Sequence, residues 1–321
     1  MSLVLVTRKL PSSVLAKLRE RADVDLYTGE APIPPDELRA RASDKEAIVC
    51  LVTDAIDRAV LDAAPKLKVV ANVAVGYNNI DAVYAKSKGV VVTNTPDVLI
   101  DSVADFTWAL ILAVTRRLSE GERLLRRGAW KGWALDFMLG TELRGKQLGL
   151  VGLGRIARAV AARAPAFGMR VAYVSRTPGD GGPGSNNALS AGESMSLDRL
   201  LNTSDVVSLH VPLTPETRHL IDKKAIARMK RSAYLINTAR GPVVDEAALA
   251  WALQQHLLAG AALDVYENEP VVHPDLLGLE NVLLVPHLAS GTTETRTAMA
   301  DLAVDNVIAV LSGRAPLTPV P

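Results

Sequence analysis

The sequence predicts an α/β protein with two domains, each built around a parallel β-sheet. Short apolar runs alternate with amphipathic helical segments along most of the chain, which is the pattern of successive βαβ units. The apolar runs carry hydrophobic residues at consecutive positions, as in parallel sheets that helices cover on both faces. A length of 321 residues and a hydrophobic content of 49% are sufficient for two such cores.

The first domain is expected over residues 1–98. Its candidate strands are the apolar runs at 3–7, 47–53, 67–75 and 90–96, with helical segments between them. Near the end of the chain, a further segment at 292–313 has an amphipathic helical period. We expect this helix to return to the first domain, so that residues 288–321 complete it and the domain is discontinuous.

The second domain is expected over residues 99–287, and a long helical segment at 101–128 leads into it. Six candidate strands follow, at 147–152, 170–175, 205–211, 233–238, 260–265 and 281–286. Helical segments separate most of these strands, which fits a doubly wound, nucleotide-binding sheet. We therefore expect two parallel-sheet domains that are separated by a cleft.

The composition argues against several classes of partner. The formal net charge is +1 and no dense block of Lys and Arg occurs, so we expect no nucleic-acid partner. The longest strongly apolar stretch, 108–114, is much shorter than the roughly 20 residues that span a bilayer. The single cysteine, Cys50, lies in an apolar run, and the five histidines are scattered. These features predict a cytoplasmic protein without membrane or metal partners.

A glycine-rich turn follows the candidate strand at 147–152. The sequence "GLGRIA" places Gly152, Gly154 and Ala157 at the spacing of a dinucleotide-binding turn. The first glycine allows a tight turn, the second lets the backbone approach a pyrophosphate, and the small third residue lets the helix pack on the strand. The phosphates would lie at the helix N-terminus, where N–H groups and the helix dipole attract anions. The turn therefore predicts a Rossmann-like domain that binds a dinucleotide.

The next strand ends without the acidic residue that commonly holds the ribose 2′-hydroxyl of NAD. Ser175, Arg176 and Thr177 stand there instead. A guanidinium and two hydroxyls suit a 2′-phosphate, and Arg155 inside the turn could add a second positive charge. An isolated Arg176 would equally be a solvated surface residue, but after a glycine turn we predict NADP(H) as the preferred cofactor and NAD(H) as the second option. The Gly-, Ser- and Asn-rich segment that follows, 178–194, is predicted to be a loop.

Three later strands end in polar residues. Arg240 follows one strand, Asp264 and Glu269 follow the next, and His287 follows the last. Ligands of open α/β sheets bind outside the carboxyl ends of the strands, so these side chains and the glycine turn should share one edge. An arginine suits a carboxylate, and a histidine beside an acid suits proton transfer. Taken singly, each of these residues is as well explained by an ion pair or a structural role.

Six motifs, in this order, resemble the D-isomer-specific 2-hydroxyacid dehydrogenase family, and within it the glyoxylate/hydroxypyruvate reductases. They are "VAVGYNNID", "GLGRIARAVAARAPAFGMRVAYVSR", "LHVPLTPETRHLI", "INTARGPVVDEAAL", "AALDVYENEP" and "VPHLASGT". The resemblance covers nearly the whole chain, and its one departure in the fingerprint is Ala157 in place of the third glycine. It implies NADPH-dependent reduction of small 2-oxo acids, namely glyoxylate to glycolate and hydroxypyruvate to D-glycerate.

The resemblance also implies roles for individual residues. Arg240 would hold the substrate carboxylate, and His287, paired with Glu269, would give a proton to the carbonyl oxygen. By composition Glu267 is an equally simple acid, and only the family motif selects Glu269. First-domain substrate contacts would come from Leu51, Thr53, Val75 and Gly76, the last two through backbone N–H groups. Further cofactor contacts would come from Thr107, Ile156, His210, Val211, Pro212, Thr238, Ala239 and Asp264.

Trp130 and Trp133 in "GAWKGW" are prominent in a chain with only 4% aromatic residues. In similar reductases a tryptophan of this segment reaches the substrate site of a neighbouring subunit, and packing in a core or at a dimer contact is the alternative. Together with the apolar helix "FTWALILAV", the segment predicts a homodimer.

Two alternatives to glyoxylate/hydroxypyruvate reduction stay open at this point. Within the same class, the substrate could be that of a phosphoglycerate, lactate-type or phosphonate dehydrogenase. A phosphorylated substrate would favour basic residues in "VAVGYNNID", which has none. Outside this class, the same fold could serve a dinucleotide-sensing corepressor or scaffold. Turnover of small oxo acids separates an enzyme from such a binding protein.

Overall fold

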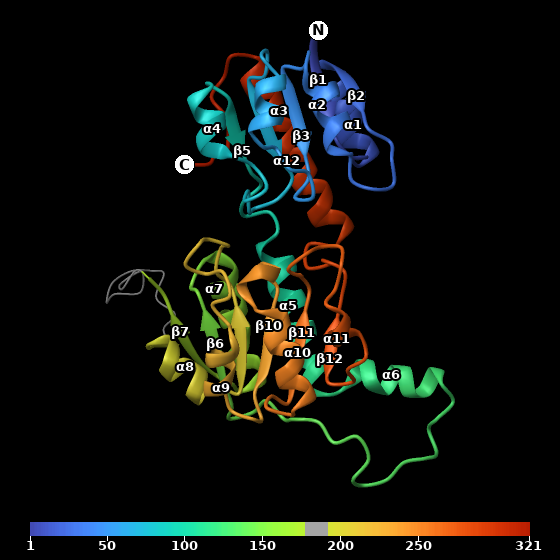
Figure 1. Cartoon of the computed structure of the whole chain (residues 1–321), viewed down its shortest axis with the longest axis vertical. Helices are drawn as coiled ribbons and strands as arrows, with labels where there is room; N and C mark the ends of the chain where they lie inside the picture. The colour runs from blue at the N-terminus through green and yellow to red at the C-terminus, as the bar shows by residue number, and fades with distance from the viewer. Residues whose placement is uncertain (177–191) are drawn as a thin grey trace. The chain divides into compact units, whose positions relative to one another are not determined.

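The computed structural model describes residues 1–176 and 192–321, which form two compact α/β units (Figure 1). One unit consists of Met1–Leu99 and Thr292–Pro321, and the other of Ile100–Gly291. The strands of each unit pair in parallel within one sheet. The predicted fold class, two parallel-sheet α/β units of which the first is discontinuous in sequence, is confirmed.

The sheet of the first unit has the strand order β2-β1-β3-β4-β5. Its strands are β1 (Ser2–Val6), β2 (Ala22–Leu26), β3 (Ala47–Cys50), β4 (Val69–Asn72) and β5 (Val91–Thr93). Its helices are α1 (Ser12–Arg19), α2 (Pro35–Ala42), α3 (Arg58–Ala63), α4 (Ala82–Ser87) and α12 (Thr293–Leu311).

Alternate residues of the central strands of this sheet face two separate cores. Leu5, Ile48 and Val70 pack in one cluster together with residues of α2, α3 and α4. Val4, one position before Leu5, and Val49, one position after Ile48, pack in a second cluster with residues of α1 and α12. Because side chains alternate across a strand, a run that is apolar at every position is buried on both faces.

The sequence analysis does not identify β2, which is an edge strand of the first sheet, or α2, which follows it in the chain. The sequence of β2, "ADVDL", has acidic residues at alternate positions and so lacks a continuous apolar run. The carboxylate of Asp25 binds Arg41 of α2 and lies 3.3 Å from Nζ of Lys45. An edge strand needs one buried face only, and here ion pairs occupy part of the other face.

The sheet of the second unit has the strand order β12-β11-β10-β9-β6-β7-β8. Its strands are β6 (Gln147–Val151), β7 (Arg170–Val174), β8 (Gly192–Ser194), β9 (Val206–Leu209), β10 (Tyr234–Asn237), β11 (Gly260–Leu263) and β12 (Val282–Leu284). Its helices are α5 (Ile100–Thr115), α6 (Leu118–Arg126), α7 (Arg155–Arg163), α8 (Leu197–Thr203), α9 (Lys223–Arg228), α10 (Glu246–Gln254) and α11 (Pro274–Leu277), with short 3₁₀ turns at Ala164–Phe167 and Gly241–Val243.

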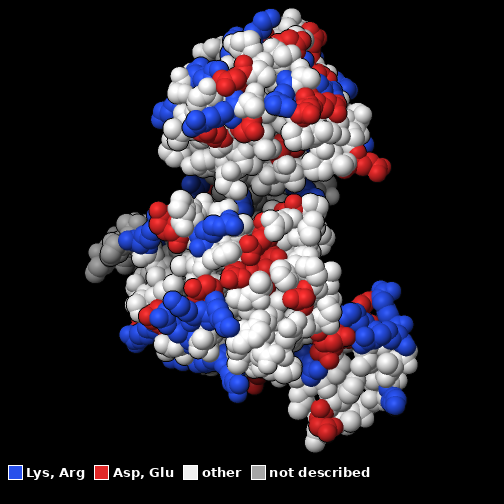
Figure 2. Space-filling view, viewed as in Figure 1, with Lys and Arg blue, Asp and Glu red and all other residues white. Residues whose placement is uncertain are grey.

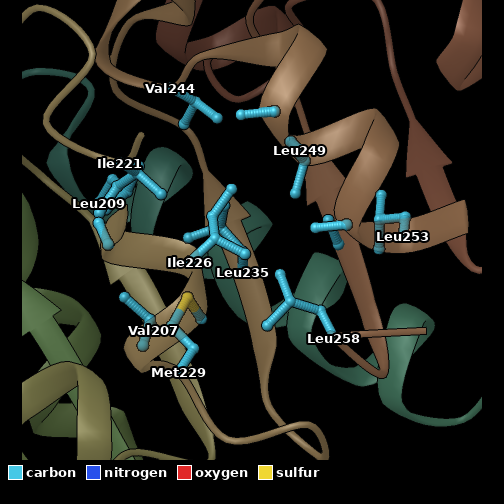
Figure 3. Packing of buried hydrophobic residues seen from close by; sticks show 14 of the residues in the cluster. Val207, Leu209, Ile221, Ile226, Met229, Leu235, Val244, Leu249, Leu253 and Leu258 are labelled. Atoms are coloured by element: carbon cyan, nitrogen blue, oxygen red, sulfur yellow. The ribbon is translucent and has the colours of Figure 1, made fainter. Parts of the chain in front are cut away.

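Both faces of this second sheet are also buried. Figure 3 shows one core, in which Val207 and Leu235 of the sheet meet Ile226 of α9 and Leu249 and Leu253 of α10. The opposite core brings residues of α5 and α7 against the other face of the same strands. The sheet is therefore covered on both sides, as its apolar sequence predicts.

Two expectations for the second unit need correction. Residues 192–194, the end of the predicted loop, form β8 and pair in parallel with β7; residues 177–191 lie outside the described part of the chain. The single helical segment expected at 101–128 is two helices, because Arg117 between α5 and α6 has a left-handed backbone with φ of 55°. The burial pattern changes at the same place, since half of α5 is buried and α6 has no buried residue.

The surface carries both signs of charge. On the face seen in Figure 2, Lys and Arg side chains are interspersed with Asp and Glu over both units. Of the helices in residues 1–176 and 192–321, none combines the length and the apolar character that crossing a lipid bilayer requires.

Candidate active site

The polar residues predicted in the second unit lie at the carboxyl ends of its parallel strands (Figure 1). The glycine turn follows β6, Arg240 follows β10, Asp264 directly follows β11, and His287 comes three residues after β12. Parallel strands end on one edge of their sheet. The structure therefore brings these groups to a common edge of the second unit.

His287 and Glu269 are in contact at this edge. Nδ1 of His287 lies 2.9 Å from Oε2 of Glu269, and each side chain is about one-third exposed (35% and 30%). The other carboxylate oxygen of Glu269 accepts the N–H of Tyr266 at 3.1 Å. The Tyr266 hydroxyl donates to the carbonyl oxygens of Leu263 and Val285, which fixes this loop to β11 and β12. Both oxygens of Glu269 are thus engaged, and the carboxylate has a defined position against the imidazole.

The charge state of Glu269 follows from its surroundings. Burial raises the pKa of Glu269, but the hydrogen bond and charge of His287, the N–H of Tyr266 and the charge of Arg240 lower it, and the net effect is a pKa below the ordinary value. The carboxylate is therefore ionised at neutral pH. This ionised carboxylate faces Nδ1 of His287.

Asp264 holds the turn on which His287 stands. Its carbonyl oxygen accepts the N–H of His287 at 3.0 Å, and its two carboxylate oxygens accept the N–H groups of Leu288 and Ala289 at 2.5 and 3.0 Å. His287 has a φ of 52°, a backbone conformation that few non-glycine residues adopt and that surrounding structure must hold in place. Asp264 is fully buried, and burial raises its pKa. It acts here as a strand-end cap that positions the histidine.

Arg240 is fixed by local bonds and by close packing. Asn237 donates to the carbonyl oxygen of Arg240 at 3.0 Å and accepts the N–H of Ala239 at 3.0 Å, and Nη1 of Arg240 donates to the carbonyl of Ala239 at 2.7 Å. The next residue, Gly241, lies so close to the loop after β11 that an added Cβ would be 1.9 Å from the carbonyl carbon of Tyr266. Burial lowers the pKa of Arg240, and the charge of Glu269 opposes that shift. Arg240 and Glu269 therefore interact electrostatically.

Glu267, the other acid of the same loop, has different partners. Its Oε2 lies 3.0 Å from Nε2 of His219, and its Oε1 accepts the N–H of Glu246 at 2.9 Å. In return, Oε1 of Glu246 accepts the N–H of Glu267 at 2.6 Å. Burial raises the pKa of Glu246. The sequence analysis misses Glu246 and His219, and the structure places Glu269, not Glu267, against His287.

The glycine turn has the geometry that a bound pyrophosphate needs. Gly152 has a φ of 97°, and a Cβ there would lie 2.6 Å from the carbonyl oxygen of His210, so only glycine fits. Gly154 is the N-cap of α7, and a Cβ there would meet no described atom within 4 Å, so the backbone is open to a phosphate at the helix N-terminus. Ala157 of α7 is fully buried in the core that α7 forms with β6. These residues fit a dinucleotide.

The other predicted cofactor residues occupy neighbouring strand ends. Ser175 and Arg176 follow β7, and Arg176 is exposed; Thr177 lies outside the described residues. A hydrogen bond from Thr214 is the main cause of a lowered pKa at Glu216, and the charge of Arg176 contributes to the same shift. A carboxylate therefore lies within electrostatic range of Arg176.

Hydrogen bonds within the second unit fix the side chains of Thr107, Thr238 and His210. The Thr107 hydroxyl donates to the carbonyl of Val103 at 2.8 Å and lies 3.1 Å from the hydroxyl of Thr238. Nε2 of His210 lies 2.9 Å from the hydroxyl of Ser208, and burial lowers the pKa of His210 to about 4. The remaining predicted cofactor residues are Ala239 after β10, Val211 and Pro212 after β9, and Arg155 and Ile156 at the start of α7.

The predicted substrate contacts of the first unit lie on two loops. Leu51 and Thr53 follow β3, and Val75 and Gly76 follow β4. Three asparagines that the sequence analysis misses hold these loops: Asn72 donates to the carbonyl of Gly76, Asn94 to that of Val75, and Asn79 to that of Leu51. An amide at the end of an otherwise apolar strand, as in "VVAN", is the sequence signal that could have identified the first of them.

Comparison with known proteins identifies the class. The family model for "D-isomer specific 2-hydroxyacid dehydrogenase, NAD binding domain" matches residues 108–289. The chain belongs to this family. It is an NAD(P)-dependent oxidoreductase that acts on CH–OH groups and binds a nicotinamide dinucleotide.

Relatives and solved structures match over nearly the full length. The chain is 47% identical to the glyoxylate reductase of Korarchaeum cryptofilum, over 98% of this chain and 94% of that one. It is 48% identical to the glyoxylate reductase of Thermofilum pendens, over 98% and 92%. Among solved structures, an NADPH-dependent glyoxylate/hydroxypyruvate reductase from Sinorhizobium meliloti in complex with NADP and malonate is 38% identical, with a TM-score of 0.87 over 99% of this chain and 96% of that one.

Proposed function

We propose that the protein reduces glyoxylate to glycolate and hydroxypyruvate to D-glycerate, with NADPH as the preferred reductant. The observation that carries the proposal is the contact of His287 with Glu269, electrostatically coupled to Arg240, on the strand edge that also bears the glycine turn. The glyoxylate reductases that match the chain over nearly its full length support glyoxylate as a substrate, and the glyoxylate/hydroxypyruvate reductase of Sinorhizobium meliloti supports hydroxypyruvate.

The proton transfer follows from the geometry of the pair. Because Nδ1 of His287 faces the Glu269 carboxylate at 2.9 Å, the proton for the substrate leaves from Nε2. Glu269 stabilises the imidazolium before transfer, and His287 takes the proton back in the oxidation direction. Arg240 binds the planar carboxylate of the oxo acid with its planar guanidinium. NADPH, held by the glycine turn around Gly152 and Gly154, would supply the hydride that the carbonyl carbon accepts.

Arg176 and Ser175 support the cofactor preference. They stand at the end of β7, where an NAD-dependent site commonly has an acid, and Arg176 is exposed enough to meet a 2′-phosphate. Replacement by Ala should lower kcat/KM for NADPH about tenfold or more, as expected for the loss of a charged phosphate contact, and should leave kcat/KM for NADH within about twofold. Equal losses for both cofactors would contradict this role.

A matched pair of histidine variants tests the reaction. His287 and His256 both have positive φ values, 52° and 51°, which asparagine tolerates, and His256 is exposed at the end of α10. His287→Asn should lower kcat for glyoxylate by roughly 10²–10⁴-fold, while His256→Asn should retain wild-type kinetics. If His287→Asn retained wild-type kcat, His287 would not be the proton donor. If the wild type bound NADPH but turned over no small oxo acid, the protein would be a dinucleotide sensor instead; turnover of a different oxo acid alone would identify another 2-hydroxyacid dehydrogenase.

The segment from α6 to residue 142 supports a homodimer. α6 has no buried residue, and most of the large apolar side chains that follow it are exposed, with Trp133 at 79% and Leu135 at 82%. Figure 1 shows α6 and the following chain projecting from the body of the second unit, and Figure 2 shows that chain as largely uncharged. Glu280 forms ion pairs with Arg123 in the last turn of α6 and with Arg127 just after it.

A segment with this many exposed apolar side chains, from α6 to residue 142, is typical of an interface. We propose that its partner is a second copy of the chain. Trp130 and Trp133 are the tryptophans that could reach the partner's substrate site. The double variant Trp133→Asp/Leu135→Asp should sediment as a monomer where the wild type sediments as a dimer. A wild-type monomer at micromolar concentration would contradict the proposal.

A further inference from the structure

We propose that Glu246 and Glu267 are positioning residues for Glu269. Their carboxylates join the segment from Arg240 to Glu246 (the arginine segment) to residues 265–271 (the acid loop). The inference rests on the function proposed above, in which the first residue of the arginine segment binds the substrate carboxylate and Glu269 supports the proton donor. It adds the contact that fixes these two groups relative to each other, and every residue involved belongs to the second unit.

The contact is a reciprocal pair of hydrogen bonds (the glutamate latch). Oε1 of Glu246 accepts the N–H of Glu267 at 2.6 Å, and Oε1 of Glu267 accepts the N–H of Glu246 at 2.9 Å. Glu246 is the first residue of α10, where the backbone N–H groups have no acceptor within the helix. The carboxylate of Glu267 supplies that acceptor, at the end of the helix that attracts negative charge. The latch therefore joins the start of α10 directly to the acid loop.

The arginine segment also contacts the acid loop at its other end. Gly241 directly follows Arg240, and an added Cβ there would lie 1.9 Å from the carbonyl carbon of Tyr266. Tyr266 precedes Glu267 in the acid loop, and its own N–H donates to the carboxylate of Glu269 at 3.1 Å. Because the two segments meet at both ends of the arginine segment, the acid loop has a fixed position relative to Arg240.

A third segment of the chain is bonded at the same point. Nε2 of His219 lies 3.0 Å from Oε2 of Glu267, and the N–H of His219 donates to the carbonyl of Pro242 in the arginine segment at 2.8 Å. Both carboxylate oxygens of Glu267 are thus engaged, one by Glu246 and one by His219. The side chain of Glu267 is only 17% exposed, so solvent competes little for these contacts.

The latch places two acids side by side, which stability alone does not favour. Glu246 is buried, burial raises its pKa, and the charge of Glu267 acts in the same direction, although the N–H of Glu267 opposes the rise. Neighbouring carboxylates repel each other, whereas an apolar contact has no such repulsion. The pair provides two directional bonds that fix the backbone on both sides. This arrangement favours a role in positioning Glu269.

The experiment measures glyoxylate reduction with NADPH in the full chain and compares Glu246→Ala, Glu246→Gln and Asp245→Ala. The Gln side chain keeps an oxygen that accepts the N–H of Glu267, and Ala does not. Asp245→Ala is the matched control, because Asp245 caps the same helix by accepting the N–H of Ala248 at 2.9 Å. We expect Glu246→Ala to lower kcat/KM about two- to fivefold, since it acts through a partly exposed pair of side chains. The other two variants should retain wild-type kcat/KM, and all three should retain the wild-type Kd for NADPH.

A double variant separates positioning from a general structural role. If Glu246 acts through Glu269, adding Glu246→Ala to Glu269→Gln should have almost no further effect on kcat/KM, because the charge that the latch positions is already absent. A general structural defect would instead multiply with the loss caused by Glu269→Gln. Multiplied losses would overturn the inference, and so would a Glu246→Gln variant that is as impaired as Glu246→Ala.

Hydrogen exchange tests the latch without turnover. Amide hydrogens of the acid loop should exchange about tenfold faster in Glu246→Ala, whereas in Asp245→Ala the increase should be confined to α10. Wild-type exchange of the acid loop in Glu246→Ala would overturn the inference. A thermal melt accompanies each variant, and if Glu246→Ala does not fold, Glu267→Ala replaces it in every comparison. A wild type that reduces no oxo acid would refute the proposed function, while hydrogen exchange would still judge the latch.

Discussion

Replacement of Glu269 by Gln tests the proton-donor pair most sharply, because it removes a charge and keeps the shape. The side-chain carbonyl of Gln can still accept the N–H of Tyr266, which Glu269 accepts at 3.1 Å. His287 loses an anion whose oxygen lies 2.9 Å from Nδ1. Two unit charges about 4 Å apart interact by about 4 kcal/mol at an effective dielectric of 20 and by about 1 kcal/mol in water. With both side chains about one-third exposed, solvent screening reduces the gain to at most about 1 kcal/mol.

A loss of up to about 1 kcal/mol corresponds to a factor of up to about five in rate. In Glu269→Gln, kcat/KM for glyoxylate reduction should therefore fall by up to about fivefold. Glycolate oxidation needs the neutral imidazole and should lose less. The assay is kcat/KM between pH 5 and 9 in both directions. An unmoved reduction profile, or equal losses in both directions at every pH, would refute the electrostatic role of Glu269.

The same pair also links stability to pH. The pKa of Glu269 is lower in the folded protein than its ordinary value of 4.5. The stabilisation it provides is therefore complete above about 4.5 and is lost as the pH falls through the folded pKa. Glu269→Gln should narrow the difference in unfolding free energy between pH 6 and pH 3.

The other predictions concern the glycines and a buried histidine. Gly152→Ala should destabilise the fold by roughly 1–3 kcal/mol, because Gly152 has a φ of 97° and an added Cβ would lie 2.6 Å from the carbonyl oxygen of His210. Gly154→Ala should cost at most about 1 kcal/mol of stability yet weaken NADPH binding, since its Cβ meets no described atom; urea unfolding and NADPH titration separate the two variants. Gly241→Ala should lower kcat and unfolding free energy together, because its Cβ displaces Tyr266 and the loop that bears Glu269; a stable, active variant would contradict the packing. Burial lowers the pKa of His210 from 6.5 to about 4, so stability falls as the pH drops between these values; His210→Gln should flatten this dependence in pH-dependent melts.

The fold was predictable wherever apolar runs mark strands buried on both faces. Edge elements gave weaker signals. β2 has acidic residues at alternate positions, one of which binds Arg41, and three-residue β8 lies in a Gly- and Ser-rich context. The break between α5 and α6 depends on a left-handed Arg117, which helix periodicity does not reveal.

The sequence predicted which types of residue stand at which strand ends of the site. It predicted less well which side chains these residues contact. Composition could not choose between Glu267 and Glu269, because the choice depends on which carboxylate the loop turns toward His287. The structure resolves it through a reciprocal pair of backbone bonds between Glu267 and Glu246, which engage the other acid. Such contacts join residues distant in sequence, so a linear pattern carries no record of them.

The most direct test of the proposed function is the product of hydroxypyruvate reduction by the wild-type protein with NADPH, resolved by chiral chromatography. Membership of the D-isomer-specific family predicts D-glycerate, formed in equal amount to the NADPH oxidised. L-Glycerate, or no glycerate while NADPH binds, would contradict the account.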